Sequence, residues 1–386
     1  MVVQRGVVPA VAVALLALLA IGMLASLGAR NARTTRNTRT MRNARTTRNV
    51  DRHPASSARA DAIERIAASE LPAQLRRDAA LRRADRETRA DALRWLDTAP
   101  LGVFVHYGPS SLLAAPTNDV WWTDVHAPNY PSIARRFHPD VAAAVADWIR
   151  LARDAGASYI AVTVKHHDGY TLWHSPVAAW GQPSDADILK VLAPAARRAH
   201  LRLFLYYSTL DLHEPTYRSA AYVVEARTQL RELLTGYGPV AGVWFDGTWD
   251  HRFTNAQLES LYALVHRLQP WALVTTNHHH LPLPGEDYQT FEAGFPGHPP
   301  KGWPQTPVSG LAHQSAISLG PTWFWDGKDV PRTPARLVGL IREARASHTS
   351  LLVDIPPRPD GTYAAGVFAA VRAASRSAAA APTNGP

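Results

Sequence analysis

Short apolar runs alternate with longer segments of mixed polarity from residue 101 to residue 355. The apolar runs have the length of buried strands and cover residues 101–107, 158–164, 201–207, 240–245, 272–276 and 351–355. The longer segments have the length and apolar spacing of helices and cover residues 141–155, 185–199, 219–234, 255–268 and 336–345. Strands that alternate with helices predict a parallel α/β fold. Roughly eight such units over about 280 residues favour a (β/α)8 TIM-like barrel over an open sheet.

The alternation is lost between residues 281 and 314, which are rich in proline and glycine, so no strand or helix is predicted there. We expect the barrel to occupy residues 98–375. Residues 58–97 are rich in Ala, Arg, Glu and Leu, which predicts one or two amphipathic helices that lead into the barrel. Residues 376–386 have low complexity and are expected to form a disordered tail, with no β domain behind the barrel.

The N-terminal region has a different composition from the rest of the chain. Residues 7–28 are continuously apolar, so residues 1–29 are interpreted either as an export signal or as a membrane anchor. Residues 30–57 are rich in arginine and contain the sequence NARTTRN twice, which predicts a basic, disordered linker. Although this positive flank resists translocation, we expect export to the periplasm or the medium, with or without anchoring in the membrane.

Composition excludes several classes of site. The chain has no cysteine, so disulfides and thiolate-bound metals are excluded. Its net charge of +9 comes largely from the N-terminal linker, and no basic helix or RNA-binding motif follows residue 100. We therefore expect no nucleic-acid partner. No glycine-rich phosphate loop is present, so a nucleotide is not expected and no cofactor is predicted.

Polar and aromatic side chains stand at the C-terminal ends of the predicted strands. The clearest case is Val243-Trp244-Phe245-Asp246-Gly247, where an apolar run ends in a carboxylate and a glycine allows the chain to turn. In a (β/α)8 barrel these strand ends meet at the face that carries active sites. The other strand ends contribute His106-Tyr107, Lys165-His166-His167-Asp168, Tyr206-Tyr207-Ser208 and Asn277-His278.

These residues allow two interpretations. The histidines could bind a metal, or they could hydrogen-bond sugar hydroxyls while tryptophan faces cover the apolar side of the ring. Adjacent residues of a strand point in different directions, which argues against His166 and His167 as ligands of one metal. The run 278–280 has no further ligand at helical spacing. No metal site is therefore predicted.

The motifs resemble those of glycoside hydrolase family 29, the α-L-fucosidases. The resemblance covers about residues 95–370 and keeps the motifs in order. It implies a somewhat irregular (β/α)8 barrel and a retaining glycosidase. The motifs that carry it are Val103-Phe104-Val105-His106-Tyr107-Gly108-Pro109, Val162-Thr163-Val164-Lys165-His166-His167-Asp168-Gly169-Tyr170, Leu205-Tyr206-Tyr207-Ser208, Trp244-Phe245-Asp246-Gly247 and Leu351-Leu352-Val353-Asp354-Ile355-Pro356-Pro357.

The resemblance assigns roles residue by residue. Asp246 takes the position of the nucleophile. The sugar-binding positions fall on His106, His166, His167, Tyr207, Trp244, Trp122 and Trp323. The segment Asp287-Tyr288-Gln289-Thr290-Phe291-Glu292 is similar to the family segment that holds the general acid, with Phe291 where proline is usual. It places the acid/base at Glu292, with Glu286 as the alternative.

The implied function is exo-hydrolysis of terminal α-L-fucosyl residues from glycans or glycoconjugates. A retaining mechanism needs two carboxyl groups about 5–5.5 Å apart, one ionised and one protonated. The chain departs from the family pattern at Trp121-Trp122-Thr123-Asp124, where Glu-Trp-Tyr is usual. Two alternatives therefore stay open: a catalytically impaired, fucose-binding barrel and a metal-dependent barrel hydrolase.

Overall fold

The computed structural model describes residues 88–98, 101–183, 185–277, 281–298, 300, 305–329 and 334–380. The predicted signal or anchor, the basic linker and the lead-in helices before residue 88 lie outside these residues. Within the described part of the chain, no helix is both long and apolar enough to cross a membrane.

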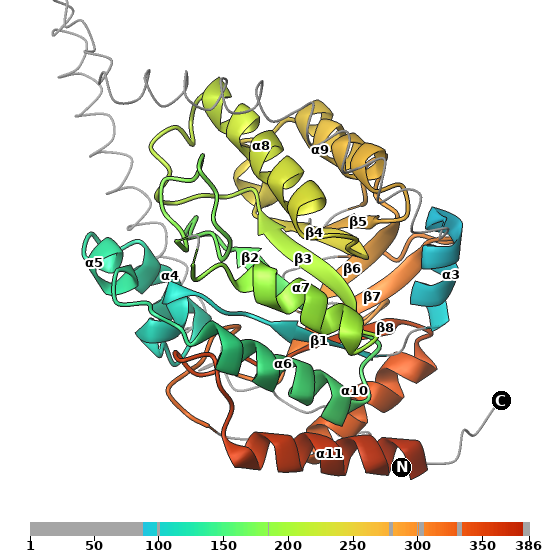
Figure 1. The fold of residues 1–386 in the computed structure, drawn as a ribbon. Helices are drawn as coiled ribbons and strands as arrows, with labels where there is room; N and C mark the ends of the chain where they lie inside the picture. Colours follow the sequence, from blue (N-terminus) through green and yellow to red (C-terminus); the bar gives the residue numbers. More distant parts are fainter. Residues whose placement is uncertain are drawn as a thin grey trace, which may run out of the picture. The chain divides into compact units, whose positions relative to one another are not determined.

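Eight parallel strands form the centre of the described fold (Figure 1). Their order in the sheet is β5-β4-β3-β2-β1-β8-β7-β6, so each strand lies beside its neighbour in sequence and β1 pairs with β8. The prediction of a (β/α)8 barrel is confirmed. The strands are β1 (Leu101–Val105), β2 (Tyr159–Lys165), β3 (Arg202–Ser208), β4 (Gly242–Asp246), β5 (Leu273–Thr276), β6 (Tyr288–Glu292), β7 (Ala312–Ser318) and β8 (Ser350–Asp354).

Helices cover the outside of the strands (Figure 1). Capping residues mark both ends of α6. Asp140 caps its start and accepts the Ala143 amide, and Gly156 ends it at φ 72°. The helices are α3 (Arg89–Thr98), α4 (Asn118–Val125), α5 (Tyr130–Ala134), α6 (Val141–Ala155), α7 (Ile188–Arg198), α8 (Ala220–Gly236), α9 (Asn255–Leu268), α10 (Pro334–Ala346) and α11 (Ala365–Ala380), with short 3-10 turns η1 (Pro109–Leu113) and η2 (Thr248–Asp250).

Side chains alternate along each strand between two cores. In β3, Leu203, Leu205 and Tyr207 pack outward with the helices. Phe204 and Tyr206 pack inward, in the centre of the barrel. Helix α3 contributes Leu96 to this inner core, and its Trp95 ring stacks on Phe204 at 6.3 Å between centroids. The helix therefore closes the barrel at the end opposite to the C-terminal ends of the strands.

The barrel has one weak seam, between β5 and β6, where no strand ladder forms. Asp287 bridges it. Its amide donates to the Val274 carbonyl at 2.7 Å, and its carboxylate accepts from the Val274 amide at 2.8 Å. His266 Nε2 lies 2.8 Å from the same carboxylate. Thr275 Oγ1 also donates to the Tyr288 carbonyl, and the Thr276 amide to Glu286 Oε2, so side chains take the place of the missing ladder.

Two predictions about secondary structure are wrong, one for residues 281–314 and one for the segment from residue 376. The region from 281 to 314 contains all of β6 and the start of β7, which were not predicted because their inward residues are polar. Thr290 and Gln314 are buried and hydrogen-bonded to Trp244 inside the barrel instead of forming an apolar run. The tail predicted from residue 376 begins as helix, because α11 continues to Ala380 and buries Ala378. Alanine has the highest helix propensity, which explains this extension.

Candidate active site

A cavity of about 430 Å³ opens at the C-terminal ends of the strands. It is the face at which barrel enzymes carry their sites. Much of its wall is aromatic, and it has three carboxyl groups and three imidazoles. The lining residues are Phe104, His106, Asn118, Asp119, Trp121, Trp122, His166, His167, Tyr206, Trp244, Asp246, Trp249, Asn277, Glu292, Trp323 and Phe324.

Asp246 is the last residue of β4 and is 6% exposed. Three donors hold its carboxylate. Tyr206 Oη donates to Oδ2 at 2.6 Å, while the Gly247 amide and Asn277 Nδ2 donate to Oδ1 at 2.8 and 3.3 Å. Such charge-assisted hydrogen bonds favour the ionised carboxylate and fix its orientation. The group is therefore held as an oriented anion.

Glu292 is the last residue of β6 and faces Asp246 across the cavity wall. Asn277 Nδ2 donates to both carboxylates. Because one nitrogen bridges them, the two bonded oxygens are separated by no more than two hydrogen-bond lengths, roughly 6 Å. This limit is compatible with the spacing of a retaining glycosidase and shorter than that of most inverting enzymes.

Burial raises the pKa of both carboxyl groups, and the nearby Glu292 charge raises the pKa of Asp246 further. Two buried carboxylates this close do not both ionise readily, so the pair retains one proton near neutral pH. Asp246 accepts three hydrogen bonds that stabilise its anion. Glu292 accepts from Asn277 and Trp323. We therefore place the charge on Asp246 and the proton on Glu292.

His106 follows β1 and is oriented by β8. Its Nδ1 lies 2.9 Å from Asp354 Oδ1, and its amide donates to the same oxygen at 3.3 Å. Asp354 is fully buried at the end of β8. A carboxylate in this position accepts the Nδ1 proton and so leaves Nε2 as a hydrogen-bond acceptor.

His166 and His167 both line the cavity, with ring centroids 4.2 Å apart. The expectation that they point in different directions is wrong, because both residues follow Lys165, the last residue of β2, and strand alternation has ended there. His166 stacks on Tyr206 at 5.2 Å, and His167 Nε2 lies 3.8 Å from Asp246 Oδ2. Burial lowers the pKa of both imidazoles, so they are neutral at pH 7.

The aromatic residues form a continuous wall. Trp244 stacks on Tyr206 at 5.3 Å and donates to Gln314 Oε1 at 3.1 Å. Trp323 lies 5.0 Å from the His106 ring. Phe324 stacks on Trp121 at 5.6 Å. Flat apolar faces beside carboxylates and imidazoles suit a sugar ring, which has apolar C–H faces and hydroxyl edges.

Two tryptophans lie at the mouth of the cavity. Trp122 from α4 and Trp249 from η2 are each 39% exposed. Both approach His167, at 6.2 and 4.9 Å between ring centroids. Trp122 was predicted to bind substrate, and the structure places it at this rim rather than in the depth of the cavity.

Two of the predicted candidates lie elsewhere. The prediction that Tyr207 binds the sugar is wrong. Residues adjacent in a strand face opposite sides, so Tyr207 points out to the helices, where its hydroxyl donates to Gln229 Oε1 at 2.6 Å. Tyr206 lines the cavity in its place. Glu286, the alternative acid, accepts backbone amides of Thr276 and Leu283 at 2.9 Å each and does not line the cavity. His278 lies outside the described residues.

Several lining residues were missed by the sequence analysis. Tyr206 could have been found from strand parity, because Phe204 and Tyr206 share one face of β3 while Tyr207 has the other. Trp249 could have been found from its position, because it lies only three residues after Asp246, the last residue of β4. Trp121 and Phe324 come together only in the folded chain. Among the described residues, no group of three histidine or carboxylate side chains could hold a metal ion.

Fold and site together resemble those of (β/α)8-barrel glycoside hydrolases, with a carboxyl pair at the strand ends and an aromatic, histidine-lined cavity. Residues 73–374 match the family model described as alpha-L-fucosidase. The chain belongs to this family, and the resemblance drawn from its motifs is confirmed.

Related sequences and solved structures give the degree of similarity. The chain is 27% identical over 301 residues to alpha-L-fucosidase 1 of Arabidopsis thaliana, a match covering 70% of this chain and 56% of that protein. It thus spans about half the length of its plant relatives. The structure of alpha-L-fucosidase AlfC from Lactobacillus casei, in complex with its alpha-L-fucose product, superposes with a TM-score of 0.63 at 26% identity, covering 75% of this chain and 98% of that one. The fold is also that of alpha-L-fucosidase isoenzyme 1 from Paenibacillus thiaminolyticus, with a TM-score of 0.64 at 23% identity, covering 76% of each chain.

Proposed function

We propose that the chain hydrolyses terminal α-L-fucosyl residues of glycans or glycoconjugates with retention of anomeric configuration. The single observation that carries this proposal is the pair of Asp246 and Glu292, bridged by Asn277 Nδ2. Membership of the alpha-L-fucosidase family and the similarity to an enzyme solved with alpha-L-fucose support the choice of sugar.

The two carboxyl groups act in two steps. Asp246 attacks the anomeric carbon while Glu292 donates its proton to the leaving glycosidic oxygen, which gives a fucosyl ester of Asp246 and a free alcohol. Glu292, now ionised, then takes a proton from water, and the water oxygen attacks the anomeric carbon and displaces Asp246. Tyr206 and the Gly247 amide hold the Asp246 carboxylate throughout.

The surroundings support recognition of a deoxy sugar. The Nε2 atom of His106 is free to accept a hydroxyl proton, because its Nδ1 is bound by Asp354. Trp323, Phe324 and Trp121 offer apolar surface to the methyl group of fucose. Imidazole acceptors and an aromatic wall thus cover the two chemically different sides of the same ring.

Hydrolysis of 4-nitrophenyl α-L-fucoside and of a fucosylated oligosaccharide tests the proposal, with the first-formed anomer followed by proton NMR. We expect α-fucose as first product. Asp246→Ala should abolish turnover of both substrates. Glu292→Gln should impair the oligosaccharide more than the nitrophenyl fucoside, because nitrophenol leaves without a proton. Glu286→Gln is the matched control and should retain turnover.

The outcome also separates the enzyme from a fucose-binding barrel. If calorimetry shows that fucose binds and neither substrate is cleaved, the chain is a fucose-binding protein and the proposed hydrolysis is wrong. Formation of β-fucose as first product would contradict the retaining mechanism even if hydrolysis is observed.

We also propose that the chain is exported, on the basis of the apolar stretch at residues 7–28. The polypeptide is then found outside the cytoplasm. Fractionation of producing cells, followed by N-terminal sequencing, distinguishes a cleaved signal from a retained anchor. Recovery of the protein with its first residues from the cytoplasm alone would contradict export.

A further inference from the structure

A buried lysine lies behind the cavity, outside the residues that line it. Lys165, at the end of β2, is 0% exposed. Its ammonium group donates to the Ser208 carbonyl and to Tyr222 Oη, both at 3.0 Å, and pairs with Asp211 Oδ2 at 3.1 Å. These three contacts use all three ammonium protons. A buried charge satisfied in this way is held in one position.

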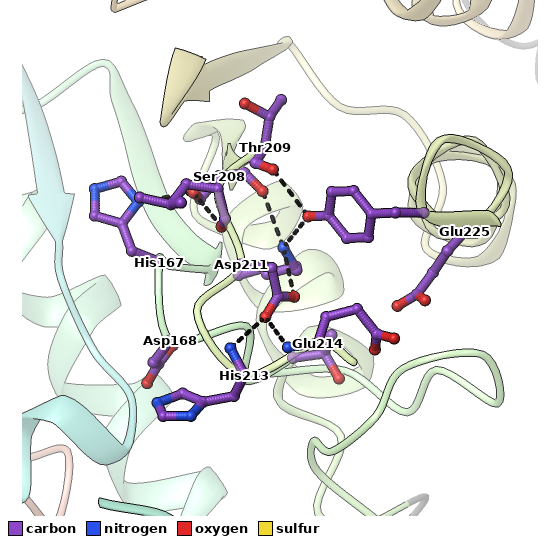
Figure 2. A network of polar contacts seen from close by, with 12 residues as sticks. His167, Asp168, Ser208, Thr209, Asp211, His213, Glu214 and Glu225 are labelled. Atoms are coloured by element: carbon purple, nitrogen blue, oxygen red, sulfur yellow. Dashed lines mark hydrogen bonds and ion pairs between the residues drawn. The ribbon is translucent and has the colours of Figure 1, made fainter. Parts of the chain in front are cut away.

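The lysine holds the loop that follows β3 through Ser208 and Asp211. Figure 2 labels Ser208, Thr209 and Asp211 of this loop. Tyr222 Oη, which accepts from Lys165, donates to the Thr209 carbonyl at 2.9 Å. Asp211 Oδ1 accepts the amides of His213 and Glu214 at 3.1 and 2.9 Å. Five residues of the loop are thus tied to the same buried cation, directly or through one further group: Ser208, Thr209, Asp211, His213 and Glu214.

The same loop binds the backbone at Asp246 and Gly247. The Thr209 amide and hydroxyl donate to the Asp246 carbonyl at 2.7 and 2.9 Å. Gly247, at φ 76°, passes so close to the loop that a Cβ there would lie 2.5 Å from Leu210 Cβ and 2.7 Å from Ser208 Oγ. The position of Ser208 is therefore fixed on both sides.

The hydroxyl of Ser208 decides which nitrogen of His167 carries the proton. Ser208 Oγ donates its single proton to the Leu210 carbonyl at 2.8 Å. His167 Nδ1 lies 2.7 Å from the same oxygen (Figure 2). Because the hydroxyl proton is already used, Nδ1 must be the donor in this contact. The Nε2 atom then has a free lone pair, and it is the atom that approaches Asp246.

We propose that Ser208, held by Lys165, is a positioning residue that keeps His167 in the Nδ1–H tautomer, so that Nε2 accepts a hydroxyl proton of the bound sugar. The last clause rests on the proposed function. Burial and the Lys165 charge lower the pKa of His167, which supports a neutral ring. His106 is fixed in the same tautomer by Asp354, so both rings present an acceptor to the cavity.

The tautomer is measured directly by long-range proton–nitrogen NMR of the full chain labelled with 15N-histidine. The His167 signals are assigned by their loss in His167→Gln. We expect a pyrrole-type Nδ1 and a pyridine-type Nε2 in the wild type at pH 7.5. A pyridine-type Nδ1, or a doubly protonated ring, would overturn the proposal, and this result needs no variant of Ser208.

The role of Ser208 is tested with Ser208→Ala, and Ser315→Ala serves as the matched control. Ser315 is also fully buried at a strand, and among the described residues its hydroxyl has no hydrogen-bond partner. In Ser208→Ala we expect His167 to acquire a fraction of the Nε2–H tautomer, and kcat/KM for 4-nitrophenyl α-L-fucoside to fall about tenfold, the value of one hydrogen bond. Ser315→Ala should change neither.

The outcomes separate this inference from the proposed function. An unchanged His167 spectrum in folded Ser208→Ala would overturn the role of Ser208. A shifted spectrum without any change in kcat/KM would overturn the role of Nε2 as acceptor. Absence of turnover in the wild type, with His167 in the Nδ1–H tautomer, would contradict the proposed function and leave the tautomer assignment standing.

Discussion

At the scale of single residues, the site depends on where one proton is held between Asp246 and Glu292. Both are buried, and burial raises the pKa of each carboxyl group above its ordinary value. The three donors on Asp246 select it as the anion. Two similar carboxyl groups thus acquire different roles from their neighbours alone.

Asp246→Asn is expected to inactivate the protein and stabilise it. The folded pKa of Asp246 lies above its ordinary value of 3.8, so the folded state binds more protons than the unfolded state, and stability falls as pH rises above about 4. Replacing the ionisable group removes this loss of stability. We expect the free energy of unfolding to rise by about 1 kcal/mol or more at pH 8 and by less at pH 4.

Thermal unfolding at the two pH values measures this gain. Asp97→Asn, at an exposed position of α3, is the control and should show no such pH dependence. An Asp246→Asn variant less stable than the wild type at pH 8 would show that the three hydrogen bonds to the carboxylate outweigh the cost of burying its charge, contrary to the raised pKa of Asp246.

The pH profile of kcat/KM should be bell-shaped. The active form carries one proton on the pair, so activity falls at low pH when Asp246 is protonated and at high pH when Glu292 ionises. Since burial raises the pKa of Glu292 above its ordinary value of 4.5, the acid should remain protonated towards neutral pH. Profiles with 4-nitrophenyl α-L-fucoside over about pH 4 to 9 test this. Glu292→Gln should lose the alkaline limb, and an unchanged limb would exclude Glu292 as the acid.

At the scale of elements, the C-terminal end of β3 distributes two adjacent tyrosines between two tasks. Tyr206 faces the cavity and binds Asp246, and Tyr207 faces the helices and binds Gln229. The alternation of a strand makes this division unavoidable, because consecutive side chains point to opposite faces. Chemically identical residues thus differ in function through register alone.

The matched pair Tyr206→Phe and Tyr207→Phe tests this division. Tyr206→Phe removes a charge-assisted hydrogen bond of about 1.5–3 kcal/mol, so kcat should fall by about tenfold or more. Tyr207→Phe should leave kcat unchanged and lower the free energy of unfolding by about 1 kcal/mol. Kinetics and urea unfolding of both variants measure the difference. Equal kinetic effects would contradict the assignment of the two faces.

At the scale of the whole described barrel, the seam between β5 and β6 carries half of the site. Asn277 follows β5 and Glu292 ends β6, so the bridge between the carboxyl groups spans the place where no ladder forms. Asp287 is one of the side chains that hold this seam together, and Arg89 pairs with it at 3.3 Å.

Asp287→Ala is expected to open the seam. The Val274 amide and His266 lose their acceptor, which should lower the free energy of unfolding by about 1–3 kcal/mol. Hydrogen exchange should rise first in β5 and β6, while β1 and β2 remain protected. Mass spectrometry of the exchanged protein follows both regions. Uniform loss of protection in all strands would show that the seam is not a separate weak point.

The architecture and many residues of the site could be predicted from the sequence. The strand β4 ends in Asp246 because an apolar run leads into a carboxylate and a glycine, a pattern visible without any tertiary contact. The histidines after β1 and β2 followed in the same way. The strands β6 and β7 were not predicted, because their inward residues Thr290 and Gln314 are polar and find their hydrogen-bond partners on other strands.

The sequence by itself therefore determined the alternation of strands and helices, the parallel barrel and the residues that stand at the strand ends, since these depend on local periodicity and length. The tertiary structure alone decided that Tyr206 rather than Tyr207 holds Asp246, that Asn277 joins Asp246 to Glu292, and that Ser208 orients His167. These outcomes depend on distances of about 3 Å between atoms far apart in the chain, which hydrophobic periodicity does not encode.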